Sequence, residues 1–422
     1  MTTVLGQEVA RRKWERFYGP VPGDWTFECF ASLFRERAER SSNREAYPLY
    51  SFTIEDGVTP KTDRYEREFL LRDKENNEFA LVHPGDFVFN PMNLRFGAIS
   101  YSKVSIPVLV SGYYVVLILD ESRCSAVFME HMLRSTQMID MYDRVAIGSL
   151  VEKRRVHLSI LNDVALPCPS LAEQIAIATI LSTWERGIRQ LSDLIAAKLQ
   201  FKMNLMQRLL TGKRRFNGFD DKWQEHRLGD VASVNFSGVD KNTVHGEENV
   251  RLCNYLDVYR NEVITNDMPF MAATASPAEI AKFSLRRHDV LITKDSETPD
   301  DIAKSAYVGD ELNGVVLGYH LGLMRPGQDL YGPFLSRLMM IPQMRYRFTQ
   351  IANGATRYGL PLDATRRMPI SIPSVAEQER IANVADIADR EIDHLRVELH
   401  ALRMQKKGLM QKLLTGQVRV KP

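Results

Sequence analysis

The chain has 422 residues, of which 44% are hydrophobic and 26% charged, and its formal net charge is +2 at pH 7. This length exceeds one ordinary hydrophobic core and predicts two or three globular domains. No apolar run of about 18 residues and no apolar signal segment is present, so we expect neither a membrane-spanning nor a secreted protein. The four widely spaced cysteines favour neither a disulfide framework nor a zinc site, and indicate the reducing cytoplasm.

The chain opens with residues 1–23, which have no counterpart further on and are expected to contain a short basic helix around Arg11–Phe17. The rest of 1–168 has short apolar strands, glycine and proline turns, and one or two helical segments. This pattern predicts an α+β domain.

A long helix is predicted over 169–212. Pro169 ends an extended segment, Ser170 can act as the N-cap, and Glu173 three residues later completes the sequence pattern of a capping box. The segment ends at Thr-Gly, where Gly212 suits the left-handed conformation that closes a helix.

The pattern then repeats. A second α+β domain is predicted over 213–372, a second long helix over 373–416, and a short tail over 417–422. "PSLAEQ" at Pro169 returns as "PSVAEQ" at Pro373, and "LLTG" at Leu209 returns at Leu413, each 204 residues later. An ungapped alignment of 169–216 with 373–420 has 20 identical positions out of 48. The two domains share only framework turns, which indicates two copies of one fold with different surfaces.

Apolar residues in both helices recur at alternating steps of four and three, the period of a coiled-coil seam. The seam residues are Ile177, Leu181, Trp184, Ile188, Leu191, Ile195, Leu205 and Leu209 in the first helix, and Ile381, Ile392, Leu395, Leu399, Leu402, Leu409 and Leu413 in the second. Each helix is acidic in its first half and basic in its second. Antiparallel pairing sets each basic half beside an acidic half, so we expect an antiparallel coiled coil with pseudo-twofold symmetry.

Catalytic and cofactor motifs are absent from the sequence. There is no phosphate-binding loop, no dinucleotide fingerprint, no paired metal-ligand spacing and no nucleophile elbow. We therefore predict a binding protein or scaffold with no catalytic residues, no bound metal and no cofactor of its own.

Basic residues in the predicted loops indicate nucleic acid as the partner, because arginine and lysine neutralise phosphates and also recognise guanine edges. Two similar domains suit two half-sites of one duplex. The candidate DNA-binding residues are Lys61, Arg64, Lys103, Lys153, Arg154, Arg155, Lys241, Arg286, Arg287, Lys294, Lys304, Arg357 and Tyr358.

The repeated proline–Ser-x-x-Glu-Gln-x-x-Ile-Ala, long helix and Leu-Leu-Thr-Gly resemble the DNA-specificity subunit of bacterial type I restriction–modification enzymes. "GYHLGLMRP" and "GATRYGLPLDATRRMPISIP" are similar to the target-recognition domains of that family, and "IGSLVEKRRVHLS" takes the place of the second of these in the first domain. The resemblance implies that each domain reads half of a bipartite DNA site. It further implies two modification subunits carrying S-adenosylmethionine chemistry, and restriction subunits that use ATP and magnesium for translocation.

Two other functions remain open from the sequence. The chain could be a stand-alone bipartite DNA-binding regulator, or part of a fused restriction–methylation enzyme, although methylase motifs are absent. Copurification with a methyltransferase subunit would distinguish these alternatives.

Overall fold

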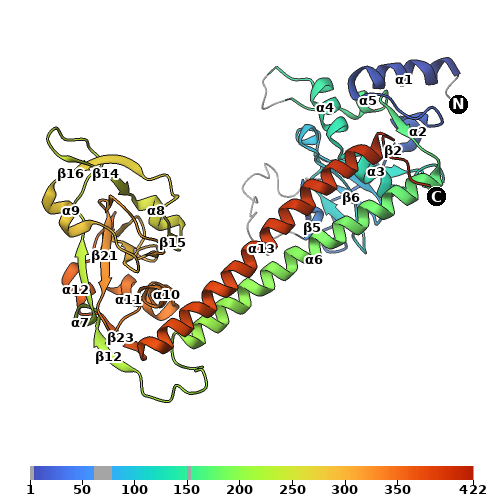
Figure 1. Ribbon diagram of the computed structural model, residues 1–422. Helices are drawn as coiled ribbons and strands as arrows, with labels where there is room; N and C mark the ends of the chain where they lie inside the picture. Colours follow the sequence, from blue (N-terminus) through green and yellow to red (C-terminus); the bar gives the residue numbers. More distant parts are fainter. Residues whose placement is uncertain (1–3, 61–77, 150–153, 422) are drawn as a thin grey trace. The chain divides into compact units, whose positions relative to one another are not determined.

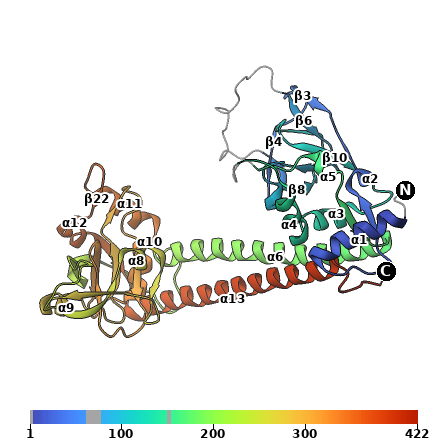
Figure 2. The same cartoon turned by 90° about the horizontal axis from the view of Figure 1, so that it is seen from above.

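Two long helices, α6 (Leu171–Leu209) and α13 (Val375–Leu414), lie side by side in the computed structural model (Figures 1 and 2). The structure describes residues 4–60, 78–149 and 154–421. The chain divides into two compact units: unit 1 is Met1–Ser192 with Val397–Pro422, and unit 2 is Asp193–Arg396. Each unit therefore contains one half of each long helix together with one α+β domain.

The halves of the two helices are antiparallel within each unit, and opposite charges face each other. In unit 1, Lys406 of α13 lies 2.6 Å from Glu185 of α6. In unit 2, Lys198 of α6 lies 2.6 Å from Glu391 of α13, and Lys202 pairs with Asp389. The predicted antiparallel coiled coil and the predicted match of basic with acidic halves are confirmed.

The seam between the helices is apolar along both partners. Every seam position named from the sequence is buried or half-buried, and Ile177, Leu181, Ile381 and Leu413 are at most 1% exposed. Complete burial of one such side chain stabilises the fold by about 1.5–3 kcal/mol. The seam thus supplies the hydrophobic attraction, while the charges select the orientation.

The repeated Glu of Ala-Glu-Gln contacts an arginine beyond the end of the other long helix. In unit 1, Arg419 donates to both carboxylate oxygens of Glu173, at 2.7 and 2.9 Å. In unit 2, Arg215 makes the same two bonds to Glu377, at 3.0 and 2.7 Å. Both glutamates are buried, so each pair closes the end of one helix onto the start of the other.

These pairs correct part of the capping-box prediction. Ser170 does accept a hydrogen bond at 3.3 Å from the backbone N–H of Glu173, as an N-cap should. The Glu173 carboxylate does not return to the cap, because it accepts instead from Arg419 and, at 3.2 Å, from the indole N–H of Trp25. The predicted left-handed glycines follow both helices, with φ of 67° at Gly212 and 72° at Gly416.

In each unit, the Gln of the same motif holds the start of one helix of the α+β domain. The amide oxygen of Gln174 accepts from the N–H of Ser125, which caps α3 (Ala126–Leu133), at 2.9 Å. The amide oxygen of Gln378 accepts from the N–H of Tyr331, the residue before α10 (Gly332–Met340), at 2.8 Å. The repeated Glu and Gln therefore attach each long helix to the domain of its own unit.

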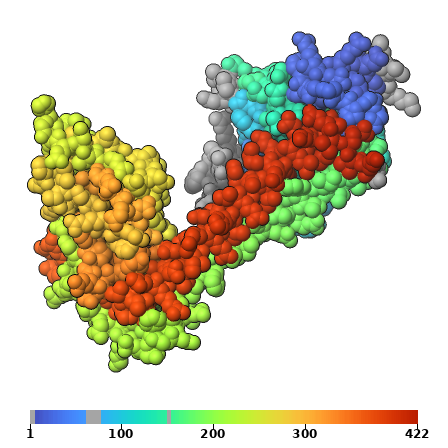
Figure 3. All heavy atoms as spheres, in the orientation of Figure 1, coloured from blue at the N-terminus to red at the C-terminus, as the bar shows by residue number. Residues whose placement is uncertain are grey.

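Unit 1 begins with α1 (Val4–Tyr18), which is longer than the short basic helix expected there. Arg11 of α1 donates to the carbonyl oxygens of Val21 and Trp25, at 2.8 and 2.7 Å. Asp24, which lies between Val21 and Trp25 in the sequence, accepts from Arg419 at 2.7–2.8 Å. The N-terminal and C-terminal segments consequently lie against each other within unit 1 (Figure 3).

The domain of unit 1 is built on an antiparallel four-stranded sheet of order β2-β10-β7-β8, beside a three-stranded sheet β3-β6-β9 and two ribbons, β1-β11 and β4-β5. Its elements are β1 (Thr26–Cys29), α2 (Phe30–Leu33), β2 (Phe34–Glu36), β3 (Arg40–Ser41), β4 (Tyr50–Thr53), β5 (Gly57–Pro60), β6 (Phe79–Val82), β7 (Phe87–Phe89), η3 (Leu94–Phe96), β8 (Ile99–Tyr101), β9 (Val108–Val110), β10 (Val115–Leu119), α3, α4 (Thr136–Val145), α5 (Leu158–Leu161) and β11 (Ala165–Cys168).

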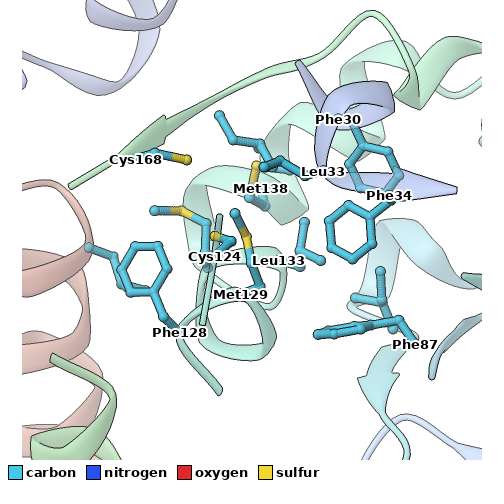
Figure 4. Packing of buried hydrophobic residues seen from close by; sticks show 14 of the residues in the cluster. Phe30, Leu33, Phe34, Phe87, Cys124, Phe128, Met129, Leu133, Met138 and Cys168 are labelled. Atoms are coloured by element: carbon cyan, nitrogen blue, oxygen red, sulfur yellow. The ribbon is translucent and has the colours of Figure 1, made fainter. Parts of the chain in front are cut away.

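The main core of unit 1 lies between this sheet and helices α2 to α4. Phe30 stacks on Phe34 with ring centroids 4.5 Å apart, and Phe34 meets the edge of Phe87 at 5.3 Å (Figure 4). Cys124 and Cys168 lie in the same core as free thiols. A hydrogen bond with Cys124, together with burial, raises the pKa of Cys168 well above its usual value, so this thiol is neutral and acts as a core residue.

The domain of unit 2 has a five-stranded sheet of order β13-β21-β17-β19-β15, a three-stranded sheet β16-β14-β20, and two ribbons, β12-β23 and β18-β22. Its elements are β12 (Gln224–Arg227), α7 (Leu228–Val231), β13 (Ala232–Phe236), β14 (Glu248–Cys253), α8 (Tyr255–Arg260), β15 (Val263–Ile264), β16 (Met271–Ala275), α9 (Pro277–Phe283), β17 (Val290–Thr293), β18 (Asp295–Ser296), β19 (Ser305–Val308), β20 (Val315–Leu317), β21 (Leu321–Pro326), α10, α11 (Pro342–Ile351), β22 (Tyr358–Gly359), α12 (Leu362–Arg366) and β23 (Pro369–Ile372).

The two domains share one framework. The order β2-β10-β7-β8 corresponds to β13-β21-β17-β19, and the ribbon β1-β11 corresponds to β12-β23. The turn before β7 and the turn before β17 are alike in detail: Asp86 accepts from the N–H of His83, and Asp289 accepts from the N–H of Arg286, both at 2.8 Å. The α+β class and the homology of the two domains are therefore confirmed.

We predict that Arg215→Ala destabilises unit 2, because it leaves the buried carboxylate of Glu377 without its cation. The free energy of unfolding should fall by about 3 kcal/mol, measured by urea denaturation. Arg214→Ala is the matched control, since Arg214 is the preceding residue and its side chain is exposed; its effect should stay within about 0.5 kcal/mol. Equal unfolding midpoints for the two variants would contradict the structural role given to the pair.

Candidate nucleic-acid interface

Three segments of unit 2 meet where β17 ends. The N–H of Lys294, the residue after β17, donates to the carbonyl of His320 at 2.9 Å, and the carbonyl of Lys294 accepts from the N–H of Leu360 at 2.9 Å. These bonds join the end of β17, the turn between β20 and β21, and the loop before α12. We call this place, formed by residues 293–296, 318–320 and 354–360, the β17 junction.

The loop 354–358 is closed by its own backbone. Asn353 and Gly359 exchange N–H to carbonyl hydrogen bonds of 3.0 and 2.8 Å. Gly354 has a φ of 147°, and a Cβ there would collide with the carbonyl of Arg357, so the loop requires glycine at this position. The exposed Arg357 is presented from this closed loop.

Five of the candidate DNA-binding residues of the second domain gather around the β17 junction. Lys294, Arg357 and Tyr358 belong to it directly. Lys304 adjoins it, because its carbonyl accepts from the N–H of Thr293 at 3.0 Å. Lys241 follows Val239, whose carbonyl accepts from the N–H of Tyr319 at 2.7 Å. The tertiary structure thus collects residues that are more than a hundred positions apart in sequence.

The ion pairs at the junction change how its lysines are interpreted. Lys294 lies 2.8 Å from Asp295, and Lys304 lies 3.4 Å from Asp301. A lysine with a carboxylate partner is a weaker phosphate ligand than a free one, since the acid already neutralises it. Arg286 and Arg287 are exposed but precede β17, so they lie at the opposite end of that strand from Lys294.

Sequence reasoning missed three residues of the junction: Asp295, Tyr319 and His320. The Tyr319 side chain is 49% exposed, and the ammonium of Lys294 lies 4.7 Å from the centre of its ring. The corresponding turn of unit 1 carries Tyr113, which is 44% exposed. The Gly-Tyr pair shared by both domains was visible in the sequence and would have pointed to an exposed aromatic residue in each turn.

Unit 1 has the same junction with different side chains. The N–H of Val156 donates to the carbonyl of Pro91, the second residue after β7, at 2.9 Å. Ile147 and Arg155 exchange backbone hydrogen bonds of 3.0 and 2.9 Å, as Asn353 and Gly359 do in unit 2. The segment between Ile147 and Arg155 is therefore the counterpart of the loop 354–358, although their sequences differ.

The three candidate residues of the first domain that the structure describes are not gathered in this way. Lys103 lies 3.2 Å from Glu130, beyond the far end of β8. Arg154 contacts the side chain and the carbonyl of Asp143, as well as the carbonyl of Ala146, so its guanidinium holds the loop to the end of α4. Arg155 is half-buried. Three further candidates lie outside the described residues: Lys61, Arg64 and Lys153.

Other kinds of site are not found among the described residues. In the part of the chain that the structure describes, no group of three or more His, Cys, Asp or Glu side chains could hold a metal ion. None of the helices within the same residues is long and apolar enough to cross a membrane.

Comparison with known proteins gives relatives of nearly the same length. The chain is 21% identical over 438 residues to the "Putative type I restriction enzyme MjaX specificity subunit" of Methanocaldococcus jannaschii, covering 96% of each chain. It is also 21% identical to the MjaVIII specificity subunit of the same organism, over 63% of this chain and 65% of the relative. No family model matches the chain.

Solved structures with the same fold share 15% sequence identity with this chain. A chain from a study of the assembly and conformational transition of the type I R-M system has a TM-score of 0.61 and is covered to 99%. The type I restriction–modification S subunit from M. genitalium has a TM-score of 0.53, covered to 96%, and the HsdS subunit from Thermoanaerobacter tengcongensis has 0.51, covered to 98%. These alignments cover 93–94% of this chain.

Two similar α+β domains and two antiparallel long helices define an architectural class of protein. Within that class, the fold of this chain is that of the type I specificity subunits. The similarity in sequence extends over nearly the whole chain. The resemblance predicted from the repeats is confirmed.

We predict different effects for the arginines of the two corresponding loops. Arg154→Ala should lower the stability of unit 1 by about 1 kcal/mol, because it removes the hydrogen bonds to Asp143 and Ala146. Arg357→Ala should leave stability within about 0.5 kcal/mol but weaken DNA binding, since Arg357 is exposed. Thermal unfolding and DNA binding of both variants test this, and a stability loss confined to Arg357→Ala would refute it.

Proposed function

We propose that this chain is the sequence-recognition subunit of a type I restriction–modification enzyme and reads a bipartite site on duplex DNA. The observation that carries the proposal is the recurrence of one framework in both units with different side chains at its loop junction. A protein that reads two unlike half-sites needs this combination of constant framework and changed contacts. The match to type I specificity subunits over 96% of the chain supports it.

The catalytic chemistry belongs to partner subunits in this proposal. Two modification subunits bring S-adenosylmethionine, restriction subunits bring ATP and magnesium, and this chain acts without catalysis of its own in the cytoplasm. Its contribution is to select the DNA and hold the other subunits at that place.

Exposed apolar residues on the long helices supply surface for such subunits. In unit 1, Val397 and Met404 are 70% and 56% exposed. In unit 2, Phe201 and Met203 are 64% and 58% exposed. A partner subunit that covers these side chains would remove their apolar surface from water, which favours association.

The alternative, a stand-alone bipartite DNA-binding regulator, is separated from this function by one experiment. Cells expressing the chain together with its modification subunit should carry methyl groups at a single split motif, detected by methylome sequencing. Cells with either protein alone should lack that methylation, because recognition and methyl transfer are on different chains. Methylation by the purified chain alone would sink the proposal, and so would an unmethylated genome when both proteins are present and assembled.

We further predict that the long helices set the length of the unread spacer between the half-sites. One added heptad after Ser192 in α6, matched by one after Arg396 in α13, keeps the seam in register and adds about 10.5 Å. The methylated motif should then gain about three base pairs of spacer, at 3.4 Å each, while its half-site bases stay the same. Changed bases with an unchanged spacer would show that the helices do not control this distance.

A further inference from the structure

The carboxylate of Asp295 at the β17 junction is fixed by two neighbours. The Lys294 ammonium donates to its Oδ2 at 2.8 Å, and Nδ1 of His320 lies 2.6 Å from the same oxygen. Among the described residues, no hydrogen bond ends on the other oxygen, Oδ1. The Asp295 side chain is 27% exposed. The junction therefore presents a partly exposed carboxylate, oriented by two neighbours, with a cationic donor beside it.

The charge around this acceptor disfavours a phosphate contact. Over residues 294–304 the acids Asp295, Glu297, Asp300 and Asp301 outnumber the bases Lys294 and Lys304. Both lysines already face carboxylates. An acidic segment repels the DNA backbone, whereas a carboxylate oxygen is a good acceptor for the exocyclic amino group of a base. A base edge is the part of DNA that this site suits.

The backbone is strained where it holds the site together. His320 has a φ of 71°, and only three non-glycine residues in the described part of the chain have a positive φ, all of them in unit 2. A side chain in this region costs free energy, which the surrounding structure must supply. Here the conformation lets the His320 carbonyl accept from the Lys294 N–H while its imidazole contacts Asp295.

The corresponding junction of unit 1 lacks this chemistry. Pro91 takes the place of Lys294, because its carbonyl accepts the corresponding backbone hydrogen bond. Met92 then takes the place of Asp295, and Tyr114, which follows the exposed tyrosine of the turn, takes the place of His320. None of these three side chains carries a charge. The framework is common to both units, so the Lys294–Asp295–His320 group is a feature of the second domain alone.

We propose that Asp295 is a specificity-determining residue that reads a C·G base pair in the major groove of the second half-site. Oδ1 accepts a hydrogen bond from the cytosine N4 amino group, and Lys294 donates to O6 of the paired guanine. The donor and acceptor of this base pair lie side by side in the groove, as the two side chains do at the junction. His320 acts as a positioning residue that orients the carboxylate. The inference rests on the function proposed above.

The test uses the full chain assembled with its modification subunits and duplexes in which each base pair of the methylated motif is replaced in turn. Asp295→Asn keeps the size of the side chain but places an amino group at the junction. It should reduce discrimination at one C·G position by about 10- to 100-fold and leave the other half-site unchanged. Lys294→Met should weaken discrimination at the same position, and it serves as the second probe if Asp295→Asn does not assemble.

Asp363→Asn is the matched control, because Asp363 is an exposed acid of the same unit whose side chain is 79% exposed. This control should leave the discrimination at every base pair of the motif unchanged. Unaltered discrimination in both junction variants, an equal loss of affinity for all sequences, or a changed A·T position would each overturn the inference while the proposed function stands. A wild-type assembly that methylates without any sequence preference would instead overturn the proposed function, and this inference with it.

Discussion

The buried glutamate that follows Pro-Ser-x-Ala in each long helix is the residue on which the rest of the architecture depends. Its carboxylate lies in a protein interior and needs a cation, and the cation comes from an arginine three residues after the left-handed glycine that follows the opposite helix. Hydrogen bonding to Glu377 raises the pKa of Arg215, in keeping with a stable charged pair. Because each helix supplies both a glutamate at its start and an arginine at its end, only the antiparallel arrangement satisfies both pairs.

This pairing explains why the two most obvious repeats in the sequence occur together. Ala-Glu-Gln and Leu-Leu-Thr-Gly look like separate signals for the start and end of a helix. In three dimensions they meet: Gly212 ends the helix against Trp223, and Arg215 then turns back to Glu377. The amide oxygen of Gln378 accepts from the N–H of Tyr331 and so holds the start of α10. One set of short motifs thereby closes the helix pair and attaches a domain to it, once in each unit.

Local patterns were sufficient to predict the helices but not the surface that would contact a ligand. The seam from Ile177 to Leu209 follows from a period that neighbouring residues determine, and the left-handed glycines follow from backbone sterics. The β17 junction, in contrast, requires residues 294, 320 and 360 to meet through strand pairing. Nothing near Asp295 in sequence indicates that His320 will face it. Counting basic residues selected Lys294 without weighing Asp295, the acid that directly follows it in the sequence.

The division of the chain between the two units has a consequence for biosynthesis. Unit 2 is one continuous segment, Asp193–Arg396, so all of its residues have been made before the ribosome reaches the end of the chain. Unit 1 joins the first residues to the last. The Glu173 carboxylate, which also accepts from Trp25, cannot form its ion pair until Arg419 has been made, some 246 residues after Glu173. The first domain to be synthesised is consequently the last to be completed, and until then it exposes the apolar side of α6 that α13 later covers.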